Sequence, residues 1–185
     1  MRQLILQMSV TLDGYVAGPA GDGDWGLAPE HQEVRGWKVA SLRRVGTHIM
    51  GRVTYELMAE YWPTATGDYA AFMNDLPKVV FSRTLPSADW PGSRIASGDL
   101  AEEVAALKSE PGESGEIMVH GGATFVQALS RLGLIDEYRL VIHPVALGSG
   151  LPLFKDLARP LSLDLAEANR FPDGTVINVY RPART

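Results

Sequence analysis

Short apolar runs recur along the chain, separated by stretches in which apolar residues fall at helical spacing. The runs predict buried strands at residues 4–10, 47–50, 79–81 and 117–119. Helical spacing predicts amphipathic helices at residues 30–45, 52–61 and 124–132, and a further helix that begins at residue 99. Strands and helices that alternate in this way are typical of an α/β domain with a parallel sheet.

Local signals mark the ends of several elements. Asp99, with Glu102 three residues later, forms a capping box, and Gly133 ends the helix at 124–132. The glycine-rich segment 14–27 predicts a long loop. Beyond residue 137 the pattern predicts three strands, at 138–145, 161–168 and 175–180, with a turn at 172–174 between the last two. We therefore expect one α/β domain over residues 1–185, with a mostly parallel central sheet flanked by helices and a C-terminal antiparallel hairpin.

Composition restricts the kinds of partner. The chain has 185 residues, 45% of them hydrophobic and 21% charged, which suits one ordinary globular domain. It contains no cysteine, which excludes disulfides, thiolate zinc sites and cysteine nucleophiles, and we expect no metal. The net charge of -5 argues against nucleic-acid and anionic-membrane partners. No apolar run approaches the ~20 residues that span a bilayer, so we expect a cytoplasmic protein that binds small molecules.

Three predicted strands run directly into turns that suit a ligand. The turns contain Gly51, Arg52 and Thr54; Ser82, Arg83 and Thr84; and His120, Gly121, Gly122, Ala123 and Thr124. Glycine allows close backbone approach, the N–H groups at a helix start bind anions, and hydroxyls beside a guanidinium suit a phosphate monoester. Each turn alone also fits an ordinary tight turn or a solvated loop. Together, at successive strand ends of one sheet, they favour a binding site.

These turns belong to a larger resemblance. Residues 9–17, 50–56, 81–84, 121–122, 133–138 and 144–154 resemble, in the same order, the stand-alone members of the dihydrofolate reductase and riboflavin-reductase superfamily. The resemblance covers nearly the whole chain. It implies a dihydrofolate-reductase-like fold and an NADPH-dependent reductase that acts on a small heterocyclic substrate. It also implies a homodimer, in which the edge of the final hairpin would be covered.

The resemblance also implies roles for individual residues. The pyrophosphate of NADPH would be held by the turn at Gly51, Arg52 and Thr54 and by the turn from His120 to Thr124. The 2'-phosphate would be held by Ser82, Arg83 and Thr84, with help from Arg52. Backbone groups of Val16 and Ala17 would contact the nicotinamide carboxamide, and residues 18–26 would form a lid that excludes water.

Candidate acids are less clearly marked. Glu30 is the nearest match to the acid of dihydrofolate reductases, although a residue in a first helical turn also fits a solvated partner of the helix dipole. Asp13 is a second candidate that equally suits a turn-holding role. His143 on a late strand fits either the substrate or the core. Four aromatic residues fit an apolar slot or the core: Trp25, Trp37, Tyr61 and Trp62.

Two departures bear on the substrate. Riboflavin-pathway reductase domains usually open with a motif that has two lysines, and Gln7 and Tyr15 stand at those positions. The zinc deaminase often fused to such domains needs cysteine, which this chain lacks. A C=N or C=O bond in a compound such as dihydrofolate is therefore favoured over the phosphoribosylaminouracil of riboflavin biosynthesis. A reductase of other carbonyls or imines and a non-catalytic NADPH-binding module stay open as alternatives.

Overall fold

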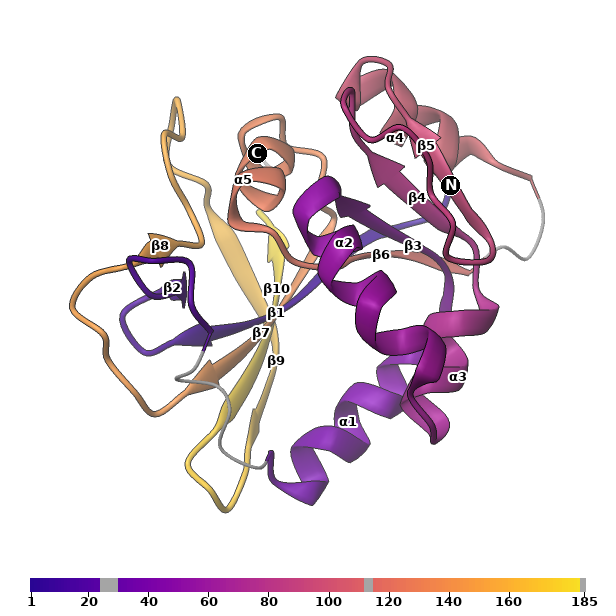
Figure 1. Ribbon diagram of the computed structural model, residues 1–185. Helices are drawn as coiled ribbons and strands as arrows, with labels where there is room; N and C mark the ends of the chain where they lie inside the picture. The colour runs from indigo at the N-terminus through magenta and orange to yellow at the C-terminus, as the bar shows by residue number, and fades with distance from the viewer. Residues whose placement is uncertain (24–29, 112–114, 184–185) are drawn as a thin grey trace.

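The computed structural model describes residues 1–23, 30–111 and 115–183. In this part of the chain an eight-stranded sheet has the order β5-β4-β3-β6-β1-β7-β10-β9 (Figure 1). Its strands are β1 (Leu4–Thr11), β3 (Val45–Gly51), β4 (Lys78–Phe81), β5 (Ser93–Ala96), β6 (Glu116–Val119), β7 (Glu137–His143), β9 (Leu163–Arg170) and β10 (Val176–Pro182). A separate pair consists of β2 (Tyr15–Ala17) and β8 (Leu151–Pro152). The helices are α1 (Gln32–Leu42), α2 (Arg52–Tyr61), the short η2 (Trp62–Thr64), α3 (Asp68–Asp75), α4 (Leu100–Ser109) and α5 (Ala123–Arg131).

The sheet is parallel from β5 to β7 and ends in an antiparallel hairpin. β1 pairs in parallel with both β6 and β7, and β3 with both β4 and β6. β10 runs antiparallel to β7 and to β9. This confirms the expected α/β fold. All the parallel strands therefore end along one edge of the sheet, where ligands of such sheets bind.

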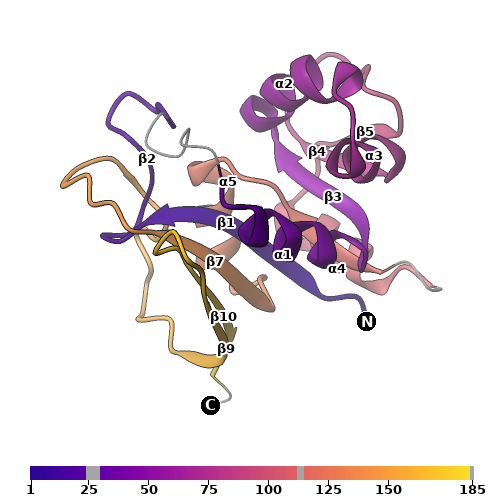
Figure 2. The same ribbon diagram turned by 90° about the horizontal axis from the view of Figure 1, so that it is seen from below.

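Helices cover the two faces of the sheet (Figure 2). On one face, α4 and α5 bury apolar residues against Leu4, Leu6 and Val119. On the other face, α1, α2 and α3 pack through three smaller clusters that include Met50 and Met118. Successive strand residues alternate between these layers because side chains in a strand point to opposite faces. The parallel strands are thus covered on both sides, whereas β9 is exposed along most of its length.

The boundaries differ from the sequence predictions in informative ways. α1 begins at Gln32, with His31 as its N-cap, so Glu30 precedes the helix rather than lying in its first turn. The same helix ends at Leu42, and Val45 opens β3. Part of the predicted loop at 14–27 is β2, which pairs with β8. α3 and β5 were not predicted, because neither has a clear apolar period in so few residues.

Several predicted end residues lie at the ends of the observed elements, with Asp99 as the N-cap of α4. The carboxylate of Asp99 accepts hydrogen bonds from the backbone N–H groups of Ala101 and Glu102, and so caps α4. Gly133 follows α5 with a φ of +64°, a conformation that glycine adopts without strain. Gly174 closes the β9–β10 turn, also at positive φ. These residues mark where α4 begins, where α5 ends and where the β9–β10 hairpin turns.

Candidate functional site

Two glycine turns meet at the carboxyl edge of the neighbouring strands β3 and β6. Gly121 and Gly122 have φ values of +36° and +80°, which strongly favour glycine. A Cβ atom on Gly122 would lie 2.9 Å from the hydroxyl oxygen of Thr54, and one on Gly51 would lie 3.3 Å from Phe125. The start of α2 and the start of α5 are therefore packed against each other with no space for further side chains.

This junction presents backbone donors at two helix starts that no side chain caps within the described residues. The N-caps of α2 and α5 are Gly51 and Gly122, and neither provides a side-chain hydrogen bond to the first turn of its helix. The first N–H groups of a helix have no partner within it, and they carry the positive end of the helix dipole. Two such helix starts side by side, with the Thr54 hydroxyl between them, suit an anion such as a pyrophosphate.

The turn after β4 extends this edge of the sheet. The Ser82 hydroxyl oxygen accepts hydrogen bonds from the N–H groups of Thr84 and Leu85, at 3.2 and 2.9 Å, and so shapes the turn. Arg83 is exposed, and its guanidinium forms no hydrogen bond or ion pair within the described residues. Arg52 is paired with Glu56 at 2.9 Å on the exposed side of α2. Both guanidinium groups are accessible from solvent.

Asp13 holds two loops together. Its carboxylate accepts hydrogen bonds from the Thr11 hydroxyl at 2.6 Å and from the N–H groups of Leu147 and Gly148. These hydrogen bonds, the one from Thr11 foremost, lower the pKa of Asp13. A carboxylate that already accepts these bonds and has a lowered pKa is a poor proton donor, so the geometry favours the turn-holding role. The turn leads into β2, which contains Val16 and Ala17.

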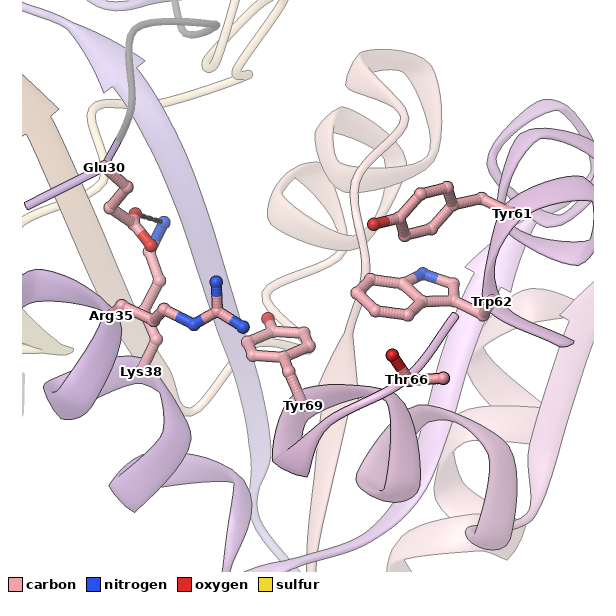
Figure 3. A pocket seen from close by; sticks show the side chains of 7 residues that line it. All are labelled: Glu30, Arg35, Lys38, Tyr61, Trp62, Thr66 and Tyr69. Carbon is pink, nitrogen blue, oxygen red and sulfur yellow. Dashed lines mark hydrogen bonds and ion pairs between the residues drawn. The ribbon is translucent and has the colours of Figure 1, made fainter. Parts of the chain in front are cut away.

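A cavity of about 290 Å³ lies between α1 and the segment from the end of α2 to α3 (Figure 3). Its lining residues are Glu30, Arg35, Lys38, Tyr61, Trp62, Thr66 and Tyr69. Glu30 and Lys38 form an ion pair, and their side chains are 29% and 16% exposed. On the opposite wall, the rings of Trp62 and Tyr69 stack with centroids 5.3 Å apart and planes 19° apart. One wall is thus charged and the other aromatic.

Burial keeps the Tyr69 hydroxyl protonated. Burial, reinforced by the negative charge of Glu30, raises the pKa of Tyr69 to about 12, although Arg35 opposes this. In Figure 3 the Arg35 side chain extends from α1 toward Tyr69. The cavity therefore offers a neutral phenol, a guanidinium and the Glu30–Lys38 ion pair to a bound molecule.

His143 ends β7 beside the end of β1. Its Nε2 atom lies 3.2 Å from the Ser9 hydroxyl oxygen. Burial, together with the charge of Lys38, lowers the pKa of His143, while Glu30 and Asp173 act in the opposite direction. The imidazole is thus close enough to the Glu30–Lys38 pair to feel its charges, although it does not line the cavity.

The structure groups the predicted residues into two regions. The glycine turns and the segment 82–84 share the carboxyl edge of the sheet, whereas Glu30, Tyr61 and Trp62 line the cavity. Trp37 packs instead with the core cluster of Val34. Trp25 and residues 24–26 of the expected lid lie outside the described residues.

Several residues of both regions were not predicted from the sequence. Arg35, Lys38, Thr66 and Tyr69 line the cavity, and His48 contacts the side chain of His120. The charged positions on the helix at 30–45 gave a signal for Arg35 and Lys38, but they are equally typical of a solvated helix face. His120 was predicted in the cofactor-binding turn, and its side chain is directed into the core toward His48.

Comparison with known proteins identifies the family. The family model of the RibD C-terminal domain matches residues 2–177. The chain belongs to the RibD C-terminal domain family. One relative is YyaP of Bacillus subtilis (strain 168), which is named as an uncharacterised protein. The two sequences are 34% identical, and the match covers 97% of this chain and 94% of YyaP.

Solved structures agree with this family and its fold. A structure described as a riboflavin biosynthesis protein from Shewanella sp. PV-4 is 27% identical, with a TM-score of 0.81, and the match covers 98% of this chain and 99% of that one. Dihydrofolate reductase from Enterococcus faecalis, in complex with NADP(H), has a TM-score of 0.63 at 13% identity and covers 98% of this chain and 97% of its own. At that identity the likeness concerns the fold, and it confirms the predicted dihydrofolate-reductase-like architecture.

Two features are absent from the part of the chain that the structure describes. Within residues 1–23, 30–111 and 115–183, no helix is both long and apolar enough to cross a membrane. Across the same residues, no cluster of three or more histidine, aspartate or glutamate side chains is arranged to hold a metal ion.

Proposed function

We propose that this protein is an NADPH-dependent reductase that transfers a hydride to a C=N or C=O bond of a small heterocyclic compound. The observation that carries this proposal is the junction of two uncapped helix starts at Gly51 and Gly122, with Thr54 between them. A dinucleotide pyrophosphate needs such a cradle of N–H donors approached closely by backbone. Family membership and the NADP(H) complex of Enterococcus faecalis dihydrofolate reductase add support.

The edge of the sheet contains residues that fit the rest of this cofactor. Ser82, Arg83 and Thr84 follow β4, which is next to β3, so they lie one strand away from the pyrophosphate cradle. An exposed guanidinium without a partner among the described residues suits a phosphate monoester, which favours NADPH over NADH. The residues from Gly121 to Thr124 would contribute through their backbone, whereas the backbone N–H of His120 already donates to the carbonyl of Ile49. Val16 and Ala17 would offer backbone groups to the nicotinamide.

When bound, NADPH supplies the hydride, and the protein supplies position and charge. The cavity residues would bind and orient the substrate. The stacked Trp62 and Tyr69 suit a planar ring, and Arg35 suits an anionic group on the same molecule. Glu30 is the carboxylate among the described residues that line the cavity. We assign to it the relay of a proton from solvent to the substrate, directly or through a water molecule, and this requires release from Lys38.

A substrate panel tests the proposal. NADPH oxidation would be followed by absorbance with dihydrofolate, the phosphoribosylaminouracil of riboflavin biosynthesis, and simple cyclic imines and quinones as separate arms. We expect turnover with at least one heterocyclic compound. Saturable NADPH binding without oxidation in any arm would support the non-catalytic binding module instead. Absence of NADPH binding would reject both.

A further inference from the structure

A pair of histidines is buried directly behind the glycine turn. His48 on β3 is fully buried, and His120, the residue before Gly121, is 7% exposed. The Nε2 atom of His120 lies 2.7 Å from Nδ1 of His48, and Nε2 of His48 lies 3.0 Å from the backbone oxygen of Phe72 on α3. The two rings meet edge to face, with centroids 4.6 Å apart.

The chemistry of this chain fixes both tautomers. A backbone carbonyl can only accept, so Nε2 of His48 must carry the proton that it donates to Phe72. Burial lowers the pKa of both groups, so both rings are neutral. Nδ1 of the neutral His48 ring is then an acceptor, and His120 donates to it from its own Nε2.

The histidine pair directly precedes the turn at Gly121 and Gly122, where both glycines have positive φ values. The backbone N–H of His120 donates to the carbonyl of Ile49 at 2.9 Å, so His120 is bound to β3 through both its backbone and its side chain. The next two residues are Gly121 and Gly122, and the Cβ position of Gly122 is already within 2.9 Å of the Thr54 hydroxyl. A shift of His120 would therefore move the N–H donors at the start of α5.

We propose that His48 and His120 are positioning residues for cofactor binding, a role that rests on the proposed NADPH-dependent function. Their hydrogen-bonded chain runs from α3 through β3 to the turn at Gly121 and sets the orientation of the N–H groups that face the cofactor phosphates. The interior could have been filled by apolar side chains at lower cost, since two imidazoles must be desolvated here. Phe72 lies one helical turn from Tyr69, so the same chain also connects the cradle to the helix that forms one cavity wall.

Three variants separate positioning from general stability. His120→Leu removes the donor and keeps the volume, whereas His120→Gln retains an N–H near the position of Nε2. Tyr138→Phe removes a buried hydroxyl bonded to Ser130 at 3.3 Å, away from the glycine turn, and serves as the control. For each, the dissociation constant of NADPH is measured by fluorescence titration, and the stability by urea unfolding.

The expected pattern is specific. The dissociation constant for NADPH should rise about tenfold in His120→Leu and stay within about threefold of the wild type in His120→Gln, because a buried acceptor without its donor forces the turn to relax. Tyr138→Phe should lose stability without losing affinity. Wild-type affinity in His120→Leu, or equal losses in the Leu and Gln variants, would overturn the positioning role while leaving the proposed function intact. Failure of the wild-type protein to bind NADPH would reject the proposed function and the positioning role with it.

Nuclear magnetic resonance of the unmodified protein gives a test that does not depend on the folding of a variant. The ¹⁵N shifts of both imidazoles should report neutral rings with the proton on Nε2. The signal of the ring Nε2–H of His120 should move when NADPH is added. A cationic ring, the other tautomer, or a His120 signal that is unchanged at saturating NADPH would overturn the proposal.

Discussion

Acid should destabilise the fold through His48. Burial, together with the charge of Lys78, lowers the pKa of this imidazole from 6.5 to about 4, although the hydrogen bond to the Phe72 carbonyl opposes the change. Between these two values the unfolded chain binds a proton that the folded chain does not bind. The stabilising contribution of the neutral ring is therefore complete above pH 6.5 and is lost as the pH falls toward 4. The difference corresponds to about 3 kcal/mol of unfolding free energy.

His120 should act in the same direction, because burial and the neighbouring His48 lower its pKa well below the usual range. Other groups also titrate in acid. The pKa of Glu137 is lowered by Arg139 and Arg181, against the effect of its own burial, so its protonation at low pH costs stability as well. The effect of the histidines must therefore be measured as a difference between two proteins.

Urea unfolding of the wild type and of His48→Gln at pH 7 and pH 4 provides this difference. The variant should be less stable at pH 7 because His120 loses its acceptor. Between pH 7 and pH 4, the wild type should lose about 3 kcal/mol more unfolding free energy than the variant. Equal losses in the two proteins would show that His48 is protonated in the fold or is exposed, and would refute the buried neutral pair.

Three further outcomes are expected. Arg83→Ala should weaken NADPH binding about tenfold or more and leave NADH binding nearly unchanged, because the guanidinium would contact the 2'-phosphate that NADH lacks; equal losses in calorimetric titrations would make Arg83 structural. Glu30→Gln should lower the turnover number on the order of 10²-fold with little change in NADPH affinity, and an unaltered steady-state rate and pH profile would exclude Glu30 as the acid. Light scattering should report a homodimer of about 40 kDa, twice the 20.1 kDa of one chain, because exposed edge strands such as β9 are usually covered; a mass near that of one chain at micromolar concentration would contradict the dimer.

The parts of the fold that depend on local signals could be predicted. The helix at 52–61 was placed with its observed ends, and Gly133 ended α5, because a helix start after a strand and a C-terminal glycine act within a few residues. α1 was predicted too long, since Val45 continues the helical spacing but pairs with Glu116 across β3 and β6. Pairing across the sheet outweighed local periodicity at that position.

In the candidate site, too, only the residues with a local sequence signature could be predicted. Gly51, Gly121 and Gly122 were identified because tight turns after buried strands have a local sequence signature. The cavity could not be predicted in full, since Arg35 and Tyr69 come from separate helices that only the tertiary fold brings together. Likewise, the hydrogen bond between His48 and His120 joins β3 to the residue that follows β6, and the two histidines are 72 residues apart in the chain.

Titration of the wild-type protein with NADPH and, separately, with NADH tests the central claim most directly. If the junction of α2 and α5 binds the pyrophosphate and Arg83 binds the 2'-phosphate, both dinucleotides should bind and NADPH should bind at least about tenfold more tightly, since a charge-assisted phosphate contact contributes roughly 1.5 to 3 kcal/mol. Equal affinities would contradict the 2'-phosphate site, and no binding of either dinucleotide would contradict the cofactor assignment as a whole.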